Sequence, residues 1–327
     1  MRSSLLILVV ACGAEPPSNA ATGSLEAWTT GTPLPTPRAN HCNAVIDDWV
    51  LVIGGNHKRA DGTFAKTDEI HAAQLVDGQL GAWQLAGRTP SPVTECSATS
   101  DGGRLFVIDG IYDREADGRQ VLAAPFADGV LAPLASLGAV PGAVISSEAT
   151  VRDGELIVMD TILPADGDQT ITLRRPLDGG AWVTDDWGIG FRAQAQYAFG
   201  RFAYTLGGYL GGEGNPATTE VFVGAATIRP TTPLPTPVMF GEAIAVDDWV
   251  FVVGGRDQVF GGTASTKVYA AQAASDGSLG AWTETALPIG RTNHELATVG
   301  DHLVLLGGAD QAGGDATVLI SRVRFAP

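Results

Sequence analysis

The sequence lacks any stretch in which apolar residues recur with the 3.6-residue period of an amphipathic helix. A mainly helical fold is therefore excluded. Glycine (42) and proline (19) are abundant instead, and Val, Ile, Thr and Trp recur in short runs between them. This combination is typical of an all-β chain with many turns.

Basic residues are scarce. Lysine and arginine together number 20 against 36 aspartates and glutamates, which gives a formal charge of −16. The phosphates of a nucleic acid would be repelled by such a chain, so we expect no nucleic-acid partner. The excess of acidic residues suits the surface of a soluble protein.

Signatures of common catalytic sites are also missing. No glycine pair is followed by Gly-Lys-Ser or Gly-Lys-Thr, so a phosphate-binding loop is not predicted. His294-Glu295 begins like the zinc motif H-E-x-x-H, but Thr298 stands where the second histidine is needed. The five histidines are not spaced as a ligand cluster. No catalytic constellation emerges from the sequence.

The amino terminus has the features of an export signal. Arg2 precedes an apolar run, Leu5–Ala11, that is too short to span a bilayer. Val9–Cys12 resembles the lipobox of bacterial lipoproteins, in which the signal is cut before a cysteine that is then lipidated; the alternative is an ordinary secretory signal. The resemblance implies a signal peptide at 1–11, a lipidated Cys12 with a flexible tether at 12–22, and export to the bacterial outer membrane.

One segment occurs twice and organises the rest of the chain. Residues 32–55, TPLPTPRANHCNAVIDDWVLVIGG, return as residues 232–255, TPLPTPVMFGEAIAVDDWVFVVGG. In each copy a Pro-rich loop leads into two β-branched runs separated by Asp-Asp and ending at Gly-Gly. This pattern predicts a β-hairpin, and its repetition indicates a repeat architecture.

Weaker copies of the hairpin bring the number to six, spaced about fifty residues apart. A third strand follows each hairpin, and a fourth is marked by Gly78–Trp83 and Gly277–Trp282. Four strands per unit and six units predict a six-bladed β-propeller over residues 23–327. The second strands of the six hairpins end at Ile53, Ile108, Met159, Leu206, Val253 and Leu306.

The two ends of the chain predict how the ring closes. Gly23–Trp28 is a copy of the fourth-strand motif with no hairpin before it, and Val318–Val323 is a third strand with no fourth strand after it. We therefore expect Leu25–Trp28 to pair with Val318–Val323, so that the N-terminal strand completes the last blade. This closure would remove two open sheet edges.

These features resemble kelch-type β-propellers of the galactose-oxidase-like superfamily. The resemblance rests on the apolar runs into Gly-Gly, on Arg38-Ala-Asn-His41 and Arg291-Thr-Asn-His294, and on the later tryptophans, and it covers nearly all of residues 23–327. Kelch-like folds include both binding proteins and enzymes. The tyrosine–cysteine copper chemistry of galactose oxidase has no recognisable counterpart in this sequence, and no cofactor is required.

The innermost strands of a propeller line its central channel, so equivalent positions form a ring. We expect this ring and its neighbours Glu95, His41 and His294 to form a channel-mouth binding site. Arg38 and Arg291 are candidate partners for its carboxylates, and a calcium ion or a cationic group is a candidate ligand. The alternative is that these side chains only face water or bond to loops. Counting back from the hairpin ends, the ring consists of Cys42, Cys96, Glu148, Ala195, Glu242 and Glu295.

The cysteines leave two alternatives. With Cys12 lipidated, Cys42 and Cys96 remain as an even pair in an oxidising compartment. They lie on adjacent inner strands, where they are either bridged by a disulfide or too far apart for one.

Two functions follow from these expectations. The first is a monomeric, membrane-anchored binding or scaffold module that presents its loop faces to a protein or glycan and meets the membrane only through its lipid. The second is an exported carbohydrate-active enzyme with Glu148, Glu242 and Glu295 in acid and base roles. We favour the first, because no motif beyond the fold requires catalysis.

Overall fold

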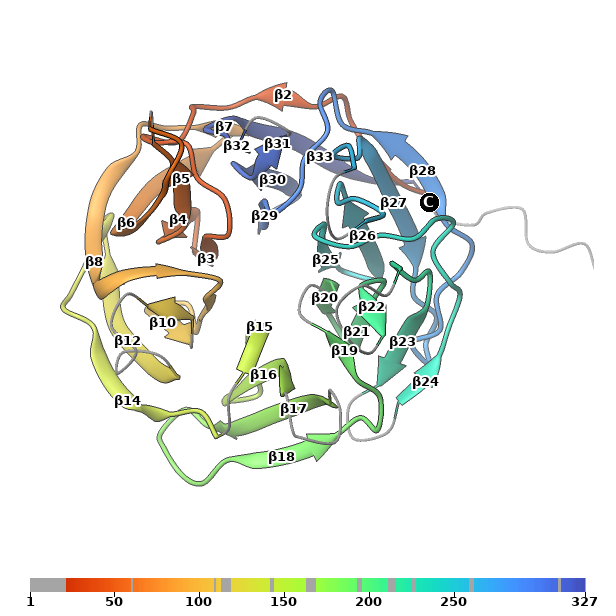
Figure 1. The fold of residues 1–327 in the computed structure, drawn as a ribbon, viewed down its shortest axis with the longest axis horizontal. Coiled ribbons are helices and arrows are strands. Elements are labelled where there is room, and N and C mark those ends of the chain that lie inside the picture. The colour runs from red at the N-terminus through yellow and green to blue at the C-terminus, as the bar shows by residue number, and fades with distance from the viewer. Residues whose placement is uncertain are drawn as a thin grey trace, which may run out of the picture.

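Six antiparallel sheets stand around a central axis in the computed structural model (Figure 1). The structure describes residues 22–326 except 60, 109, 113–118, 142–143, 163–168, 193–195, 211–215, 225–227, 259–261 and 311–312. The expected signal peptide and Cys12 lie outside these residues. All regular elements in the described ranges are strands, and none of these ranges contains a helix that could cross a membrane. The predicted all-β, six-bladed propeller is confirmed.

Each blade has four main strands, the first at the channel and the fourth at the rim (Figure 1). Blade one has β3 (Cys42–Ile46), β4 (Trp49–Ile53), β6 (Phe64–Val76) and β8 (Gln84–Thr94). Blade two has β9 (Ser97–Ser100), β10 (Arg104–Ile108), β12 (Gln120–Ala127) and β14 (Ala135–Ala139). Blade three has β15 (Val144–Arg152), β16 (Glu155–Ile162), β17 (Gln169–Pro176) and β18 (Val183–Asp186).

The other three blades repeat this order. Blade four has β20 (Gln196–Phe199), β21 (Ala203–Leu206), β23 (Val221–Gly224) and β24 (Ile228–Pro230). Blade five has β25 (Glu242–Val246), β26 (Trp249–Val253), β27 (Lys267–Gln272) and β28 (Thr283–Ala286). Blade six has β29 (Glu295–Val299), β30 (His302–Leu306), β33 (Val318–Ala326) and β1 (Thr22–Leu25), with β2 (Thr29–Thr30) beside β33. Short strands extend the loops: β5 (Asn56–Lys58), β7 (Gln79–Leu80), β11 (Ile111–Tyr112), β13 (Val130–Leu131), β19 (Phe191–Arg192), β22 (Tyr209–Leu210), β31 (Ala309–Asp310) and β32 (Gly313–Gly314).

The N-terminal strand closes the ring, as predicted. Leu25 of β1 lies opposite Val323 of β33, and Thr29 of β2 lies opposite Ile320. Leu25 and the half-buried Trp28 pack against the apolar cluster between blades five and six. The first and last parts of the chain therefore share one sheet.

The hydrophobic core is divided among the blade interfaces. One cluster joins blades one and two, another joins blades four and five, and corresponding clusters fill the other interfaces. Each blade is thus stabilised by its neighbours on both sides, as expected for a closed repeat.

The Gly-Gly pairs serve contacts between these blades. Gly54 and Gly55 have φ values of 61° and 92°, which residues with a Cβ rarely adopt. A Cβ on Gly54 would lie 2.5 Å from the carbonyl oxygen of Val93, near the end of β8 where the chain passes to blade two, and one on Gly55 would lie 2.7 Å from the Cβ of His41. The Gly55 N–H donates to the same Val93 oxygen at 2.8 Å. The pair therefore permits a close approach and a hydrogen bond between the end of β4 and the segment that leads into the next blade.

The repeated tryptophans have a matching role. The Trp83 indole N–H donates to the Thr32 carbonyl at 3.1 Å, and the Trp282 indole N–H donates to the Thr232 carbonyl at 3.2 Å. In the first pair the Thr32 hydroxyl also donates to the Leu80 carbonyl at 2.6 Å. The TPLPTP segment and the Trp motif recur together because each copy holds two adjacent blades in contact.

Candidate functional site

The first strands of the six blades enclose a channel cavity of about 240 Å³. All six strands nearest the axis in Figure 1, β3, β9, β15, β20, β25 and β29, contribute lining residues. Three of these are glutamates at equivalent positions. Glu148, Glu242 and Glu295 pair with Met159, Val253 and Leu306 at the hairpin ends.

The ring differs from the prediction in two blades. The residues opposite the hairpin ends are Ser97 in blade two and Gln196 in blade four. In blade two the turn is Gly102-Gly103, closed by the Asp101 N–H and the Arg104 carbonyl, so it has no additional residue and counting back to Cys96 is one position too far. In blade four the turn is shorter than in the other blades, with the Gly200 N–H donating to the Phe202 carbonyl. The predicted member Ala195 lies outside the described residues.

The environment of the three glutamates favours their protonated forms. Each keeps only a part of its surface accessible, and that part faces the channel. Burial raises the pKa of Glu148 to about 8. Burial also raises the pKa values of Glu242 and Glu295 well above the usual value, and the nearby carboxylates add to the rise in both. The carboxyl groups therefore hold protons near neutral pH, which weakens the negative potential expected from the sequence.

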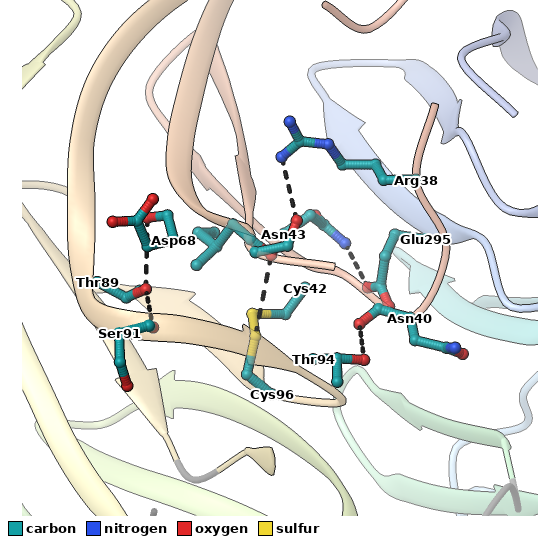
Figure 2. Close-up of a disulfide and its surroundings, with 12 residues drawn as sticks. Arg38, Asn40, Cys42, Asn43, Asp68, Thr89, Ser91, Thr94, Cys96 and Glu295 are labelled. Atoms are coloured by element: carbon teal, nitrogen blue, oxygen red, sulfur yellow. Dashed lines mark hydrogen bonds between the residues drawn. A yellow bond between two sulfur atoms is a disulfide. The ribbon is translucent and has the colours of Figure 1, made fainter. Parts of the chain in front are cut away.

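One glutamate has a hydrogen-bond donor from a neighbouring blade. Asn43 Nδ2 of blade one donates to Glu295 Oε2 of blade six at 2.8 Å and to the Leu296 carbonyl at 3.1 Å (Figure 2). The amide favours the charged form of Glu295 but is outweighed by burial.

The arginines expected to pair with the ring have other partners. Arg38 is 1% exposed, donates to the Gly54 carbonyl at 3.1 Å, and has the Glu69 carboxylate 3.9 Å away. Arg291 is equally buried and donates to the Asp315 carboxylate at 2.6 Å. Both guanidinium groups thus hold loops of the propeller together rather than neutralising the ring.

The two histidines are also buried beneath the loop face. His41 and His294 are each 1% exposed, and neither contributes to the lining of the channel cavity. Burial is the main cause that lowers the pKa of His41 and brings that of His294 to about 3. Both rings are therefore neutral. The two histidines pack against the Gly-Gly pairs, since a Cβ on Gly308 would lie only 2.6 Å from the Cβ of His294.

An arc of hydrogen-bonded backbone lies along the channel mouth from blade five through blades six and one to blade two. Asn40, Glu95, Phe240 and Asn293 all adopt left-handed conformations, with φ between 51° and 56°. The N–H of Asn293 donates to Phe240 at 2.8 Å, that of Asn40 to Asn293 at 3.2 Å, and that of Glu95 to Asn40 at 2.8 Å. The Asn293 amide also donates to Asn40 Oδ1 at 2.7 Å. We call these four residues the mouth circle.

Of the mouth circle, sequence reasoning identified only Glu95. A signal was present, because asparagine is enriched in left-handed conformations and occupies the same place in both Arg-x-Asn-His motifs. In the structure Glu95 is exposed at the mouth, where the surrounding loops partly desolvate its carboxyl group and so raise its pKa. The carboxylate therefore lies at the rim, partly shielded by the surrounding loops.

Cys42 and Cys96 form a disulfide beside this circle (Figure 2). Their Cα atoms are 5.5 Å apart, within the range that a disulfide spans. Cys42 begins β3, and Cys96 immediately precedes β9, so the bridge links the inner strands of blades one and two. The Thr94 hydroxyl donates to the Asn40 carbonyl at 3.0 Å next to it.

The described residues contain no group of three or more His, Cys, Asp or Glu placed to hold a metal ion. The ring carboxylates of Glu148, Glu242 and Glu295 therefore do not form such a group. The calcium ion expected from the sequence stays a prediction.

No protein-family model and no curated protein matches the chain. Among solved structures, the chain is similar to one titled "Structure of YjhT", with 14% identity and a TM-score of 0.68 over 91% of this chain and 99% of that one. At this identity the likeness concerns the fold alone, and it agrees with the closed propeller described above.

Proposed function

We propose that this protein is an exported, lipid-anchored β-propeller that acts as a binding module, with the loop face around the channel mouth as its contact surface for a protein or glycan. The mouth circle carries this proposal. Its hydrogen bonds join loops of blades five, six, one and two into one ordered rim. A rim fixed before binding loses little conformational entropy on contact with a partner.

The roles of the buried residues also support binding over catalysis. Arg38 and Arg291 are occupied in contacts that hold loops together, and His41 and His294 are buried away from the channel cavity. The disulfide supports export, since such bridges persist in oxidising compartments. A tether and lipid would then keep the propeller at a membrane while its loop face remains accessible.

The proposal is tested by separate substitutions on the loop face around the channel mouth and on the opposite face of the propeller. Asn293→Asp removes the amide donor of the mouth circle while keeping a residue that tolerates a left-handed conformation. Asp153→Asn is the matched control, because Asp153 is also left-handed but lies in the exposed β15–β16 turn at the opposite end of the channel. A glycan array and photo-crosslinking in intact cells from position 58, in the exposed end of the loop strand β5 on the same face, cover the two partner classes while leaving the mouth circle intact. We expect a discrete ligand that Asn293→Asp binds at least tenfold more weakly and Asp153→Asn binds normally. Equal binding by both variants would contradict the proposed face.

A second candidate function rests on Glu148. A carboxyl group with a pKa of about 8 beside a cavity of about 240 Å³ has the protonation state of a general acid. The alternative is therefore an exported carbohydrate-active enzyme. It predicts time-dependent conversion of a glycan that the wild type binds, lost in Glu148→Gln with binding retained. Stable binding without conversion favours the binding module.

A further inference from the structure

Arg256 differs from other arginines of the propeller in its partners. Arg201 pairs with Asp248 at 3.1 Å, and Arg322 pairs with Asp301 at 2.6 Å. The side chain of Arg256 donates no hydrogen bond and forms no ion pair within the part of the chain that the structure describes, and its Nε–H is buried without an acceptor. In a protein with a net charge of −16, an arginine without a carboxylate partner requires an explanation.

The position of Arg256 is well defined. It follows Gly254 and Gly255, and its backbone pairs with Met239 through two hydrogen bonds of 2.8 Å. Its guanidinium carbon lies 4.1 Å from the centroid of the Phe240 ring. Phe240 belongs to the mouth circle, so the stacking interaction places this cation at the rim of the channel mouth.

The fold itself does not require a cation here. The same backbone bridge recurs between Ala39 and Asn56 and between Thr292 and Ala309. Neither Asn56 nor Ala309 carries a charge. The backbone bridge alone therefore does not account for an arginine at the equivalent position in blade five, and the reason lies in the contacts that its side chain makes.

The surroundings of Arg256 suit an anion. The ring of Phe240 covers a face of the guanidinium group and leaves the edge of its two terminal Nη groups for in-plane contacts. Burial lowers the pKa of Arg256, and within the described residues no carboxylate acts against this effect. The glutamates behind the mouth hold protons and so repel an incoming anion little. The planar array of N–H donors matches a carboxylate or a phosphate in bidentate geometry.

We propose that Arg256, stacked on Phe240, binds the anionic oxygens of a ligand at the channel mouth, either a carboxylate or a phosphate. This inference deepens the proposed function and rests on its assignment of the mouth as the binding face. It specifies that the ligand carries a negative group within reach of blade five.

The test follows the Nε–H signal of Arg256 by NMR in the full chain, assigned by comparison with Arg256→Lys. The probes are sodium acetate and inorganic phosphate, titrated against sodium chloride at equal ionic strength. We expect the Arg256 signal to shift saturably with at least one probe, and the probe that saturates it distinguishes a carboxylate from a phosphate. The control signal of Arg201, ion-paired at the opposite end of the channel, should follow ionic strength alone. A response of Arg256 no different from that in chloride overturns the proposal.

Two variants separate binding from a purely structural role. Arg256→Lys keeps the charge but not the planar donor array, so it should bind the saturating probe about tenfold more weakly. Arg256→Gln should abolish saturation, as read from other signals of the mouth circle, and thermal melts establish that both variants are folded. Undiminished probe binding by a folded Arg256→Gln also overturns the proposal. If the partner found for the mouth binds Arg256→Gln as well as wild type, the anion inference fails while the proposed function stands.

Discussion

Asn43 and Glu295 join the first and last blades of the ring through a hydrogen bond of 2.8 Å at the channel wall. The two residues are 252 positions apart in the chain. The bond gives a buried carboxyl group one donor, and the Asn43 amide also reaches the Leu296 backbone. The contact between blades six and one therefore supplies a hydrogen bond that favours the charged form of Glu295.

The protonation of these carboxyl groups predicts the pH dependence of stability. The folded-state pKa of Glu148 is about 8, above the value of about 4.3 in an unfolded chain. The resulting stabilisation is fully present below pH 4.3 and is lost as pH rises through about 8. A rise in pKa from about 4.3 to about 8 corresponds to about 5 kcal/mol at pH 9. Glu148→Gln cannot ionise, so at pH 9 it should melt about 10 °C or more above wild type, on a scale of about 2–4 °C per kcal/mol. Near pH 4, where the carboxyl group is protonated in the folded and largely in the unfolded chain, this difference should vanish.

Thermal melts between about pH 4 and pH 9 check this prediction. Glu284→Gln on the outer strand β28 is the control, because Glu284 is 50% exposed and remote from the channel. Its difference from wild type should not vary with pH. A Glu148→Gln variant that is no more stable than wild type at pH 9 would show that the channel carboxyl groups do not destabilise the protein when they ionise.

The disulfide between Cys42 and Cys96 closes a loop with a sequence separation of 54. Replacing both cysteines by serine should lower the free energy of unfolding by about 2–5 kcal/mol. Denaturant unfolding with and without reductant measures the effect. The double variant should be insensitive to reductant, whereas wild type should lose stability on reduction. Two reactive thiols at positions 42 and 96 in unfolded, unreduced protein would exclude the bridge.

The hairpins, the blade count and the ring closure could be predicted from sequence because their signals are local. Asp47 and Asp247 each start a turn with φ above 50°, and Asp tolerates this conformation. The apolar runs on either side predict the strands. Gly23–Trp28 is a fourth-strand motif with no hairpin before it, which predicts that the N-terminal segment supplies the fourth strand of the last blade. Each of these features is encoded within a few residues.

The site was harder to predict because it depends on side-chain direction and turn length. His41 and Cys42 are adjacent in sequence, yet one packs under the loop face and the other crosses to blade two, since successive side chains alternate in direction. The shorter turn of blade four shifted the register by one position, which moves a side chain to the other face. Arg256 gave no signal, because the repeats around it do not share a charge at that position.

The tryptophan contacts between blades predict a specific loss. Trp83→Phe keeps an aromatic ring but removes the indole donor to the Thr32 carbonyl. The free energy of unfolding should fall by about 1 kcal/mol for the lost hydrogen bond, and further if the carbonyl stays buried without a partner. Trp282→Phe should behave alike, since its indole makes the same contact with Thr232.

Urea unfolding of the two variants gives this quantity. Trp49→Phe serves as the control for the change in ring size, because Trp49 contacts Phe126 edge to face and its indole has no hydrogen-bond acceptor in the described residues. A loss in Trp49→Phe as large as in Trp83→Phe would assign the effect to packing and not to the hydrogen bond.

Lipidation of Cys12 predicts the location of the protein in the cell. Cys12→Ser removes the thiol to which the lipid would attach, so the variant should be recovered in the soluble fraction of a bacterial host while wild type sediments with membranes. Fractionation with an outer-membrane marker also tests the expected membrane. Cys96→Ser is the control and should leave the distribution unchanged. Membrane recovery of Cys12→Ser equal to wild type would refute the anchor.

Closure of blade six by the N-terminal strands gives the last prediction. Beyond the strand pairing, the Glu26 N–H donates to the Arg322 carbonyl at 2.9 Å, and the Ser321 hydroxyl donates to the Glu26 carbonyl at 2.7 Å. Deleting residues 13–21 keeps all of these contacts and should leave the melting temperature unchanged. Deleting residues 13–30 removes β1, β2 and the packing of Trp28, and should cost about 3 kcal/mol or more.

The longer deletion should also change the association state, because it leaves β33 as an open sheet edge that can pair with another chain. Size-exclusion chromatography combined with thermal melts distinguishes the two deletions. We expect the protein lacking 13–21 to elute and melt like wild type, and the protein lacking 13–30 to melt earlier and form larger species. Equal melting temperatures for the two would mean that the ring is held closed by the interfaces between blades, with no net contribution from the N-terminal strands.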